Sequence, residues 1–316
     1  NAIEVNISQK EEKSHIFKVW AVTKFFWFMG IFNLTNIWGA LSLSLGIFGN
    51  WTILGHHGCH GGLVGVSRFT YAKGINRWFQ WIEWWDSRGW SYEHNHLHHY
   101  YLSEDKDPDV VEDNLEWLRR ISWLPRYFKV VVVFFLATMW KWIYYAPNIN
   151  AVSGQNKFGR VQLEYVLFYY GLIPGLYRYF WGIQFTNTLY WMFVAEVITN
   201  LHSFLVIVPN HAGEDMVRFS TSCEPFSEEF CRRQIISSVN FNYGNDVVDY
   251  FHGWLNYQIE HHLFPDKGLL WYRKAAPMVR EICAKHKIKY IKQNVFVRLF
   301  KTVEIMVGNK NMKREN

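Results

Sequence analysis

The sequence predicts an all-α, polytopic membrane protein with about four transmembrane helices, further interfacial helices and a polar cap. Apolar runs long enough to cross a bilayer alternate with long mixed segments. The 316 residues include 17 Trp and 18 Tyr, whose rings concentrate at membrane–water interfaces. The formal net charge of +6 is modest for this length, and it suits anionic headgroups or an acidic carrier better than nucleic acid.

The first membrane element is expected at 15–53, an almost continuous apolar stretch. About 20 helical residues span a bilayer core, so this stretch can form a hairpin of two crossings. Asn33-Leu34-Thr35-Asn36 would supply the tight turn between them. Residues 54–128 follow without a long apolar run and are expected to lie outside the membrane.

Three further apolar runs lie within 129–208, at 130–146, 165–182 and 189–208. If the polar segments on either side belong to one face of the membrane, an even number of these runs must cross. We expect 165–182 to be interfacial or re-entrant, because it carries Arg178 and the Pro174-Gly175 break. The other two runs then pair as a hairpin, although Lys141 weakens the first of them.

Histidine is concentrated in three short windows, 56–60, 94–99 and 261–262, which hold nine of the 14 histidines. Neutral imidazole is the commonest protein ligand for metals. A single buried histidine is more often a hydrogen-bonded core residue, but three clusters beside apolar runs favour metal binding. Residues three or four apart share a face of a helix. This spacing relates His56 to His60, His94 to His98, and Gln258 to His261 and His262.

The number of candidate ligands exceeds what one metal ion needs, so two neighbouring metal ions are the simplest interpretation. His57 and His96 fall on other faces of their helices. The four cysteines have neither disulfide nor metal-site spacing. Since a reducing compartment would keep Cys59 a thiol within the first cluster, we expect the metal site to face the cytosol. Residues 1–316 would form one domain, with 209–316 completing the cytosolic cap.

The segments around the clusters resemble the three histidine boxes of the membrane-bound fatty acid desaturases. These segments are GHHGCHGG at 55–62, EHNHLHHYYLSEDKDPDV at 93–110 and LNYQIEHHLFP at 255–265. The resemblance covers roughly residues 50–270. Gln258 replaces the first histidine of the third box, as in the front-end branch of the family. Members usually carry Asp at the position of His57.

The resemblance implies a di-iron site that activates O₂, with zinc as a possible substitute in recombinant protein. Gln258 would be either a ligand or a hydrogen-bond donor beside the ligands. The family also takes a ligand from the end of its fourth membrane helix, for which His211 is a better candidate than His202. The implied metal-binding residues are His56, His60, His94, His98, His99, His211, Gln258, His261 and His262.

Several other polar residues could orient the ligands. Carboxylates that accept hydrogen bonds from imidazoles fix the rings and raise their basicity. Glu93, Asp107, Asp109 and Glu260 are placed in sequence for this role, although Asp107 and Asp109 could equally be solvated loop charges, and Glu260 points away on a helix. His252 and Asn256 precede the third box and could add further contacts.

Two groups of residues concern the membrane and the substrate. One is a tryptophan group at helical spacing, which would anchor an interfacial helix or line an acyl tunnel. The other is a set of basic residues that would contact a headgroup, a coenzyme A phosphate or an acidic carrier, or would simply be solvated. The first group is Trp78, Trp81, Trp84, Trp85 and Trp90, and the second is Arg77, Arg88, Arg119, Arg120 and Lys129.

The expected function is oxygen-dependent desaturation of a fatty acyl chain linked to coenzyme A, a carrier protein or a lipid. The sequence has no H-P-G-G haem-domain signature, so we expect a separate electron donor, a cytochrome b-type protein or a ferredoxin with its reductase. A hydroxylase, acetylenase or decarboxylase would use the same site. A membrane zinc hydrolase is the alternative from another class. The membrane would be the endoplasmic reticulum in a eukaryote or the inner membrane in a bacterium.

Overall fold

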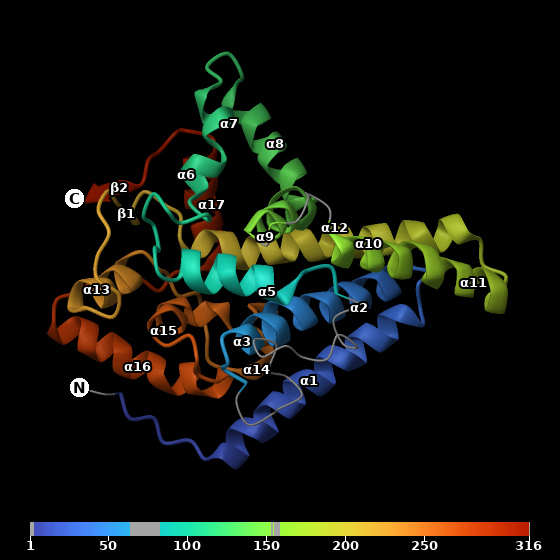
Figure 1. Cartoon of the computed structure of the whole chain (residues 1–316), viewed down its shortest axis with the longest axis horizontal. Coiled ribbons are helices and arrows are strands. Elements are labelled where there is room, and N and C mark those ends of the chain that lie inside the picture. The colour runs from blue at the N-terminus through green and yellow to red at the C-terminus, as the bar shows by residue number, and fades with distance from the viewer. Residues whose placement is uncertain (1–2, 64–82, 153, 155–158, 316) are drawn as a thin grey trace.

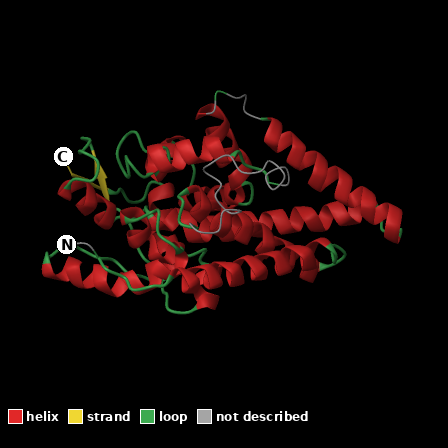
Figure 2. Ribbon diagram, turned by 60° about the horizontal axis from the view of Figure 1, so that its bottom comes forward, coloured by secondary structure: helices red, strands yellow, loops and turns green. Residues whose placement is uncertain are grey.

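The chain is mostly helical, with one small sheet, in a computed structural model that describes residues 3–63, 83–152, 154 and 159–315 (Figures 1 and 2). Long helices extend to one side of the molecule, and shorter helices and the sheet gather at the other, where both termini lie (Figure 1). The helical fold class expected from the sequence is confirmed. The predicted sites that fall outside the described residues are Arg77, Trp78 and Trp81.

The first two helices pair as a hairpin over the stretch that was expected to cross the membrane twice, and in the described part of the chain only the second helix is a candidate span. Helix α1 (Gln9–Ile31) begins at Ser8, whose side chain accepts a hydrogen bond from Glu11 N, while Glu11 accepts one from Ser8 N. Helix α2 (Ile37–Phe48) begins at Asn36, which caps two backbone amides. The two helices approach closely because Gly30 has no side chain: a Cβ there would lie 2.3 Å from Leu43 N.

Helix α2 continues without a break to the first histidine cluster. It passes through the π-helical segment η1 (Gly49–Gly55) into α3 (His56–Cys59). The whole of Ile37–Cys59 is long and apolar enough to cross a membrane, and most of it is buried within the protein. This helix therefore delivers the cluster at one end of a candidate membrane span.

The second cluster lies on α5 (Ser87–Trp90) and the π-helical η4 (Ser91–His98), and α6 (Val111–Asn114) and α7 (Glu116–Arg120) follow. Trp84, Trp85 and Trp90 are buried, so interfacial anchoring is wrong for these three tryptophans. The ring of Trp90 stacks on that of His94, with centroids 4.4 Å apart.

The basic residues near α7 differ in their surroundings. Lys129 is buried and donates to the backbone oxygen of Arg119 at 3.1 Å, so the expectation of a solvated side chain is wrong there. Arg119 itself donates to Ile305 O and to Asn311 Oδ1. Arg88 is exposed, and Arg120 is exposed beside Glu116.

The break among the later apolar runs lies elsewhere than predicted. Helix α8 (Arg126–Ala137) is bent by 77° from the helix formed by η5 (Lys141–Tyr145) and α9 (Ala146–Val152). By contrast, α10 (Arg160–Val166), η6 (Leu167–Leu172) and α11 (Ile173–Trp181) follow one another without interruption. The expected break at Pro174-Gly175 is therefore wrong, and the interrupted run is 130–146.

Side chains of α12 (Phe185–Ile207) explain the bend. Lys141 N donates to Asn200 Oδ1 at 2.9 Å, which satisfies a backbone donor that the interruption of the helix releases. The buried Lys141 ammonium forms an ion pair with the Glu196 carboxylate, and Trp142 Nε1 donates to the same carboxylate at 2.9 Å. The lysine that weakens this apolar run in the sequence thus attaches the bent segment to α12.

Two helices in the described part of the chain are long and apolar enough to span a membrane, and the bent pair would make a third. They are Ile37–Cys59 and Phe185–Asn210, the second comprising α12 and the short 3₁₀ helix η7 (Val208–Asn210). Four crossings therefore remain a prediction.

The remaining elements form the compact part that carries the third cluster (Figure 1). Strand β1 (Val217–Phe219) pairs in parallel with β2 (Lys313–Glu315), so the C-terminus folds back onto this part. The helices between the strands are α13 (Glu228–Ile236), α14 (Asp246–Phe251), η8 (Leu255–Tyr257), α15 (Gln258–Leu263), α16 (Leu269–Lys285) and α17 (Val295–Met306).

Removing one member of the buried ion pair should destabilise the fold. Glu196→Leu leaves the Lys141 ammonium buried without its counter-charge, for which we expect a loss of about 3–5 kcal/mol in the free energy of unfolding. The double variant Lys141→Met/Glu196→Leu should recover most of that loss. Chemical unfolding in mixed micelles measures both.

The surface pair of Arg120 and Glu116 provides the matched control, because Glu116→Ala should change stability by less than about 1 kcal/mol. Equal, small effects of Glu196→Leu and Glu116→Ala would contradict the role of the buried pair.

Candidate metal centre

The three histidine clusters meet at one buried place. Helix α3 brings His56, η4 brings the second cluster, and α15 brings His261. The Nε2 atoms of His56 and His261 are 3.0 Å apart, although the residues are separated by 205 positions in the sequence. The ring of His94 lies 4.7 Å from that of His56, measured between centroids. The sequence-based expectation that the clusters converge is therefore met by the folded chain.

The imidazoles form two groups that could each hold a metal ion. In each group, one nitrogen from every histidine lies within 4.8 Å of the others. The ring of His99 lies between the groups, with its centroid 4.5 Å from that of His60 and 4.2 Å from that of His262. The first group is His56, His60, His94 and His261, and the second is His98, His211 and His262.

Hydrogen bonds fix the outward nitrogen of several rings. The Nδ1 atoms of His98 and His262 each lie 2.9 Å from an acceptor, Asp107 Oδ1 and Gln234 Oε1 respectively. His211 Nδ1 lies 2.9 Å from the backbone oxygen of Ser237. These contacts favour a proton on Nδ1 and leave Nε2 free as a ligand atom. Nothing in the sequence around Gln234 and Ser237 indicated this role.

Many of the inward nitrogens lack a hydrogen-bond partner among the described residues. Both ring nitrogens of His94 and of His99, and Nε2 of His60, are buried in this state. A buried polar atom without a partner costs about 1–3 kcal/mol, so a native fold seldom accumulates several in one place. Metal ions coordinated by these nitrogens would remove that cost. The residues present therefore fit a metal centre.

The charge state of the rings also suits metal binding. Burial, followed by the charges of the neighbouring histidines, lowers the pKa of His94, His99 and His262 well below the usual value. Burial lowers the pKa of His211 to about 3. A neutral imidazole has the free lone pair that a metal requires. His98 is the exception: burial is the largest single effect and lowers its pKa, but the charge and hydrogen bond of Asp107 and the charge of Asp109 together outweigh it and raise the pKa.

The predicted carboxylates divide into two kinds. Asp107 is buried and contacts His98, and Asp109 Oδ2 lies 3.6 Å from the same ring nitrogen, so neither is a solvated loop charge. Glu260 instead accepts hydrogen bonds from Asn240 Nδ2 and from the Tyr290 hydroxyl. Burial raises the pKa of Glu260 to about 7.

Glu93, the fourth of the predicted carboxylates, makes no hydrogen bond to an imidazole of the described residues. Both of its carboxylate oxygens are buried without a hydrogen-bond partner among the described residues. Burial, and then the charges of Asp109 and Asp107, raise its pKa well above the usual value. A protonated carboxyl group is therefore the form that this position favours.

The structure brings His211 to the centre and leaves other histidines out. His202 Nε2 lies 2.7 Å from Phe251 O, and its ring stacks on Phe48 rather than joining the clusters. His57 Nε2 lies 3.1 Å from Gly253 O. His96 is exposed.

His252 and Asn256, which precede the third box, also contact groups other than the candidate metal-binding residues. His252 Nδ1 lies 2.8 Å from Val248 O, and Asn256 Nδ2 donates to Asp249 Oδ1 at 2.7 Å. Gln258, in contrast, points its amide toward the second group, with Nε2 2.9 Å from His211 Nε2. Its Oε1 accepts a hydrogen bond from Asn210 Nδ2 at 3.0 Å.

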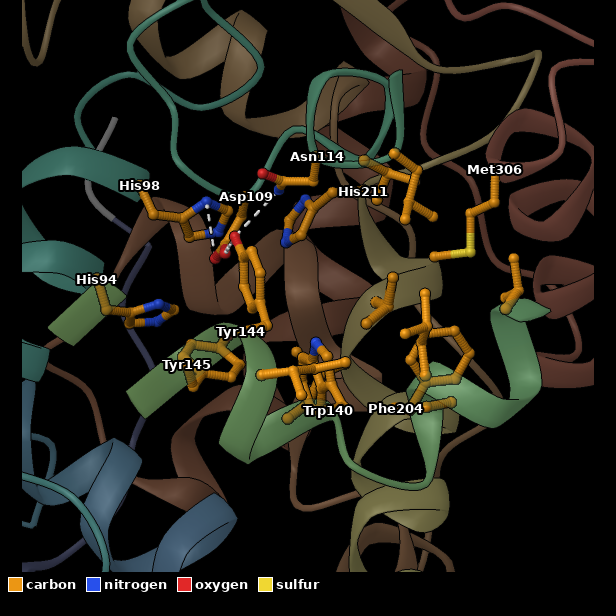
Figure 3. Close-up of a pocket in the computed structure, with 18 of the residues that line it drawn as sticks. His94, His98, Asp109, Asn114, Trp140, Tyr144, Tyr145, Phe204, His211 and Met306 are labelled. Carbon is orange, nitrogen blue, oxygen red and sulfur yellow. Dashed lines mark hydrogen bonds and ion pairs between the residues drawn. The ribbon is translucent and has the colours of Figure 1, made fainter. Parts of the chain in front are cut away.

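A cavity of about 250 Å³ leads to the centre. His94, His98 and His211 lie on one side of it, and Phe204 and Met306 lie toward the other (Figure 3). Apart from the polar groups at the histidine end and Asn114, its lining is apolar or aromatic. These lining residues include Val111, Leu115, Trp117, Val133, Leu136, Ala137, Trp140, Ile143, Tyr145, Ile207, Val208 and Leu255. The arrangement can hold an apolar chain against the imidazoles.

Known proteins resemble this chain along most of its length. The Delta(5) fatty acid desaturase A of Dictyostelium discoideum is 23% identical over 270 residues, which cover 76% of this chain and 56% of that protein. The acyl-lipid (9-3)-desaturase of Physcomitrium patens is 28% identical over 222 residues, or 65% and 40% of the two chains. The NADPH-dependent stearoyl-CoA 9-desaturase of Mycobacterium tuberculosis is 28% identical over 241 residues, or 69% and 56%.

The chain spans about half the length of the curated relatives it matches. The profile of the family described as "Fatty acid desaturase" matches residues 33–294, a range that contains all three histidine clusters and the elements between them. The resemblance of the three boxes is thus confirmed, and the chain belongs to the fatty acid desaturase family.

Proposed function

We propose that this protein desaturates a fatty acyl chain with O₂, at two iron ions held by its histidine clusters. The single observation that carries the proposal is the pair of imidazole groups at the end of an apolar cavity. Imidazole suits iron among other transition metals, and zinc could occupy the same nitrogens in recombinant protein. The proposed ligands are His56, His60, His94, His98, His99, His211, His261 and His262, with Gln258 as a further ligand or an amide donor.

The protein's part in the reaction is to hold one pair of methylene groups beside the metal centre. The apolar and aromatic part of the lining binds the acyl chain by removing it from water, and the polar part, which includes Asp109, lies at the histidine end. When bound, iron supplies the oxidising chemistry with O₂ and two electrons. The fixed rings of His98, His211 and His262 keep their nitrogens in place while a substrate binds.

The proposal also covers the group to which the acyl chain is linked and the source of the electrons. Two of the similar proteins are named for an acyl-lipid and for stearoyl-CoA, and one of these is NADPH-dependent. We propose an acyl chain linked to coenzyme A, a carrier protein or a lipid. Electrons would come from a separate cytochrome b-type protein or ferredoxin with its reductase.

We place the protein in a membrane with its metal centre toward the cytosol. The two candidate spans, and a third formed by the bent pair, support an integral membrane protein. Both Ile37–Cys59 and Phe185–Asn210 end beside the centre, at His60 and His211. Four crossings with interfacial helices would keep all three boxes on one side.

Mass spectrometry of the product separates desaturation from related outcomes. Loss of two hydrogens with a new double bond defines a desaturase, whereas a gain of one oxygen would identify a hydroxylase. Conversion of an existing double bond to a triple bond, also with loss of two hydrogens, would identify an acetylenase, and loss of carbon dioxide would identify a decarboxylase. A zinc hydrolase would need one metal with three ligands and an open water position, and it would turn over without O₂.

Loss of a predicted ligand should abolish turnover while the chain still inserts. His261→Ala removes a nitrogen from the first group, and we expect at least a 100-fold fall in product relative to wild type. Product is measured by lipid mass spectrometry in cells, with membrane insertion checked by fractionation. His96→Ala is the matched control, since His96 belongs to the same box motif but is exposed. Retained turnover in a normally expressed His261→Ala variant would contradict the ligand assignment.

A direct comparison of two histidines tests the ligand from the end of α12. His211→Ala should lower bound iron by about one ion per chain, because it removes one of only three histidines in the second group. His202→Ala should leave the iron content unchanged, since that ring contacts Phe251 O and Phe48. Metal analysis of the detergent-purified protein measures both, and a larger loss in His202→Ala would reverse the assignment.

Filling the cavity should block the substrate without displacing metal. Ala137 is buried on α8 and lines the cavity, so Ala137→Phe occupies space that the acyl chain needs. We expect product to fall at least tenfold with unchanged iron content. Val131→Phe, on the exposed face of the same helix, should retain normal turnover. Normal turnover in Ala137→Phe would show that the acyl chain binds elsewhere.

A further inference from the structure

The segment that carries His211 is attached to the C-terminal helix α17 through one arginine. Arg298 Nη2 donates to Ala212 O at 2.7 Å, immediately after His211, and its Nε lies 3.4 Å from Pro209 O, two residues before it. Arg298 Nη1 donates to Asp215 Oδ1 at 2.6 Å. A single guanidinium thus contacts the backbone on both sides of His211 and an acidic residue beyond it.

Because Arg298 is buried, loss of these hydrogen bonds would leave charged donors without partners in the protein interior. The Arg298 side chain is 0% exposed. A buried guanidinium requires nearly all its donors to be paired, and its planar shape fixes where the acceptors must lie. Asp215 supplies the counter-charge and also accepts from Lys301 Nζ at 2.7 Å. The position of Ala212 O is therefore determined by α17.

Two further residues complete the contact between Arg298 and the His211 segment. Gly213 leaves room for the guanidinium, because a Cβ there would lie 2.6 Å from Arg298 Nη2 and 2.8 Å from Asp215 Oδ1. The Thr302 hydroxyl, one turn further along α17, donates to the same Ala212 oxygen at 3.0 Å.

The remaining contacts of His211 show why its backbone needs an external anchor. His211 follows the short helix η7 and has no regular helical structure of its own. The hydrogen bond between His211 Nδ1 and Ser237 O orients the ring, but it does not determine the position of the main chain. The main chain is held before His211 by Val239 N, which donates to Asn210 O at 3.0 Å, and on both sides of it by Arg298 of α17, whereas the contact from Ser237 acts on the ring.

We propose that Arg298 is a positioning residue that sets His211 within the second group of imidazoles. This inference rests on the proposed two-metal site. It makes the C-terminal helix, which carries no histidine, a structural requirement for one of the two metal ions. The first group, whose four histidines lie on or directly after α3, on η4 and on α15, should not depend on it.

Metal analysis tests the inference with a readout independent of turnover. The full-length protein is purified in detergent, loaded anaerobically with ferrous iron and desalted, and iron per chain is measured by mass spectrometry. Wild type should bind two irons, whereas Arg298→Met and Gly213→Ala should each bind about one, as should His211→Ala. Arg298→Met combined with His211→Ala should lose no more than either single variant. Arg298→Lys, which keeps the charge and can reach part of the acceptor set, should retain more iron than Arg298→Met.

Arg126→Met is the matched control, because Arg126 pairs with Glu304 on the same helix α17 without touching the His211 segment. It should bind two irons. Gel filtration of every variant reports folding, and Gly213→Ala decides the matter if Arg298→Met aggregates. If neither variant folds, Arg298 serves the whole fold and the inference is rejected.

The possible failures are distinguishable. A wild type that binds fewer than two irons contradicts the proposed function itself. Two irons in wild type and also in folded Arg298→Met and Gly213→Ala contradict only the role of Arg298.

Discussion

The structure depends on one physical constraint, the burial of many imidazole nitrogens in a space where they cannot all hydrogen-bond. Burial forces most of these rings to be neutral, and the nitrogens of His60, His94 and His99 then have no partner among the described residues. Such an arrangement is unfavourable in a protein that holds no ligand for them. Family membership and geometry therefore both indicate that the neutral imidazole nitrogens bind metal ions.

The surrounding elements are organised by that requirement. Two parts of the chain hold three of these rings: the acidic loop around Asp107 and Asp109 holds His98, and α13 with Ser237 at its end holds His262 and His211. The acidic loop is itself tied to the membrane part, since the Tyr144 hydroxyl donates to Asp109 Oδ1 at 2.6 Å. Tyr144 also lines the cavity, so one hydroxyl links the wall that would contact the substrate to the carboxylates beside His98.

The sequence was sufficient for the helical class and for the pairing of the first two helices, because these follow from hydropathy and from the turn between the helices. The convergence of the three clusters follows instead from their capacity to bind metal and from the resemblance of the three boxes. It failed where tertiary contacts decide the outcome. The break in 130–146 depends on Asn200 and Glu196, some 60 positions away, which satisfy the amide and the ammonium of Lys141. Pro174-Gly175, a strong local signal, does not interrupt its helix. Gln234 and Ser237 orient the rings of His262 and His211, yet neither residue type marks such a role.

The contacts of Lys141 also connect the apolar helices to the candidate metal centre. A lysine in an apolar run predicts a weak span, but the ion pair of Lys141 with Glu196 holds η5 against α12. Trp140, Tyr144 and Tyr145 of that bent segment then form one wall of the cavity. A straight α8–α9 helix would carry these three aromatic rings away from His94 and His98. A buried charge in an apolar segment is costly, and the pair of Lys141 and Glu196 lies where it holds these rings beside the imidazoles.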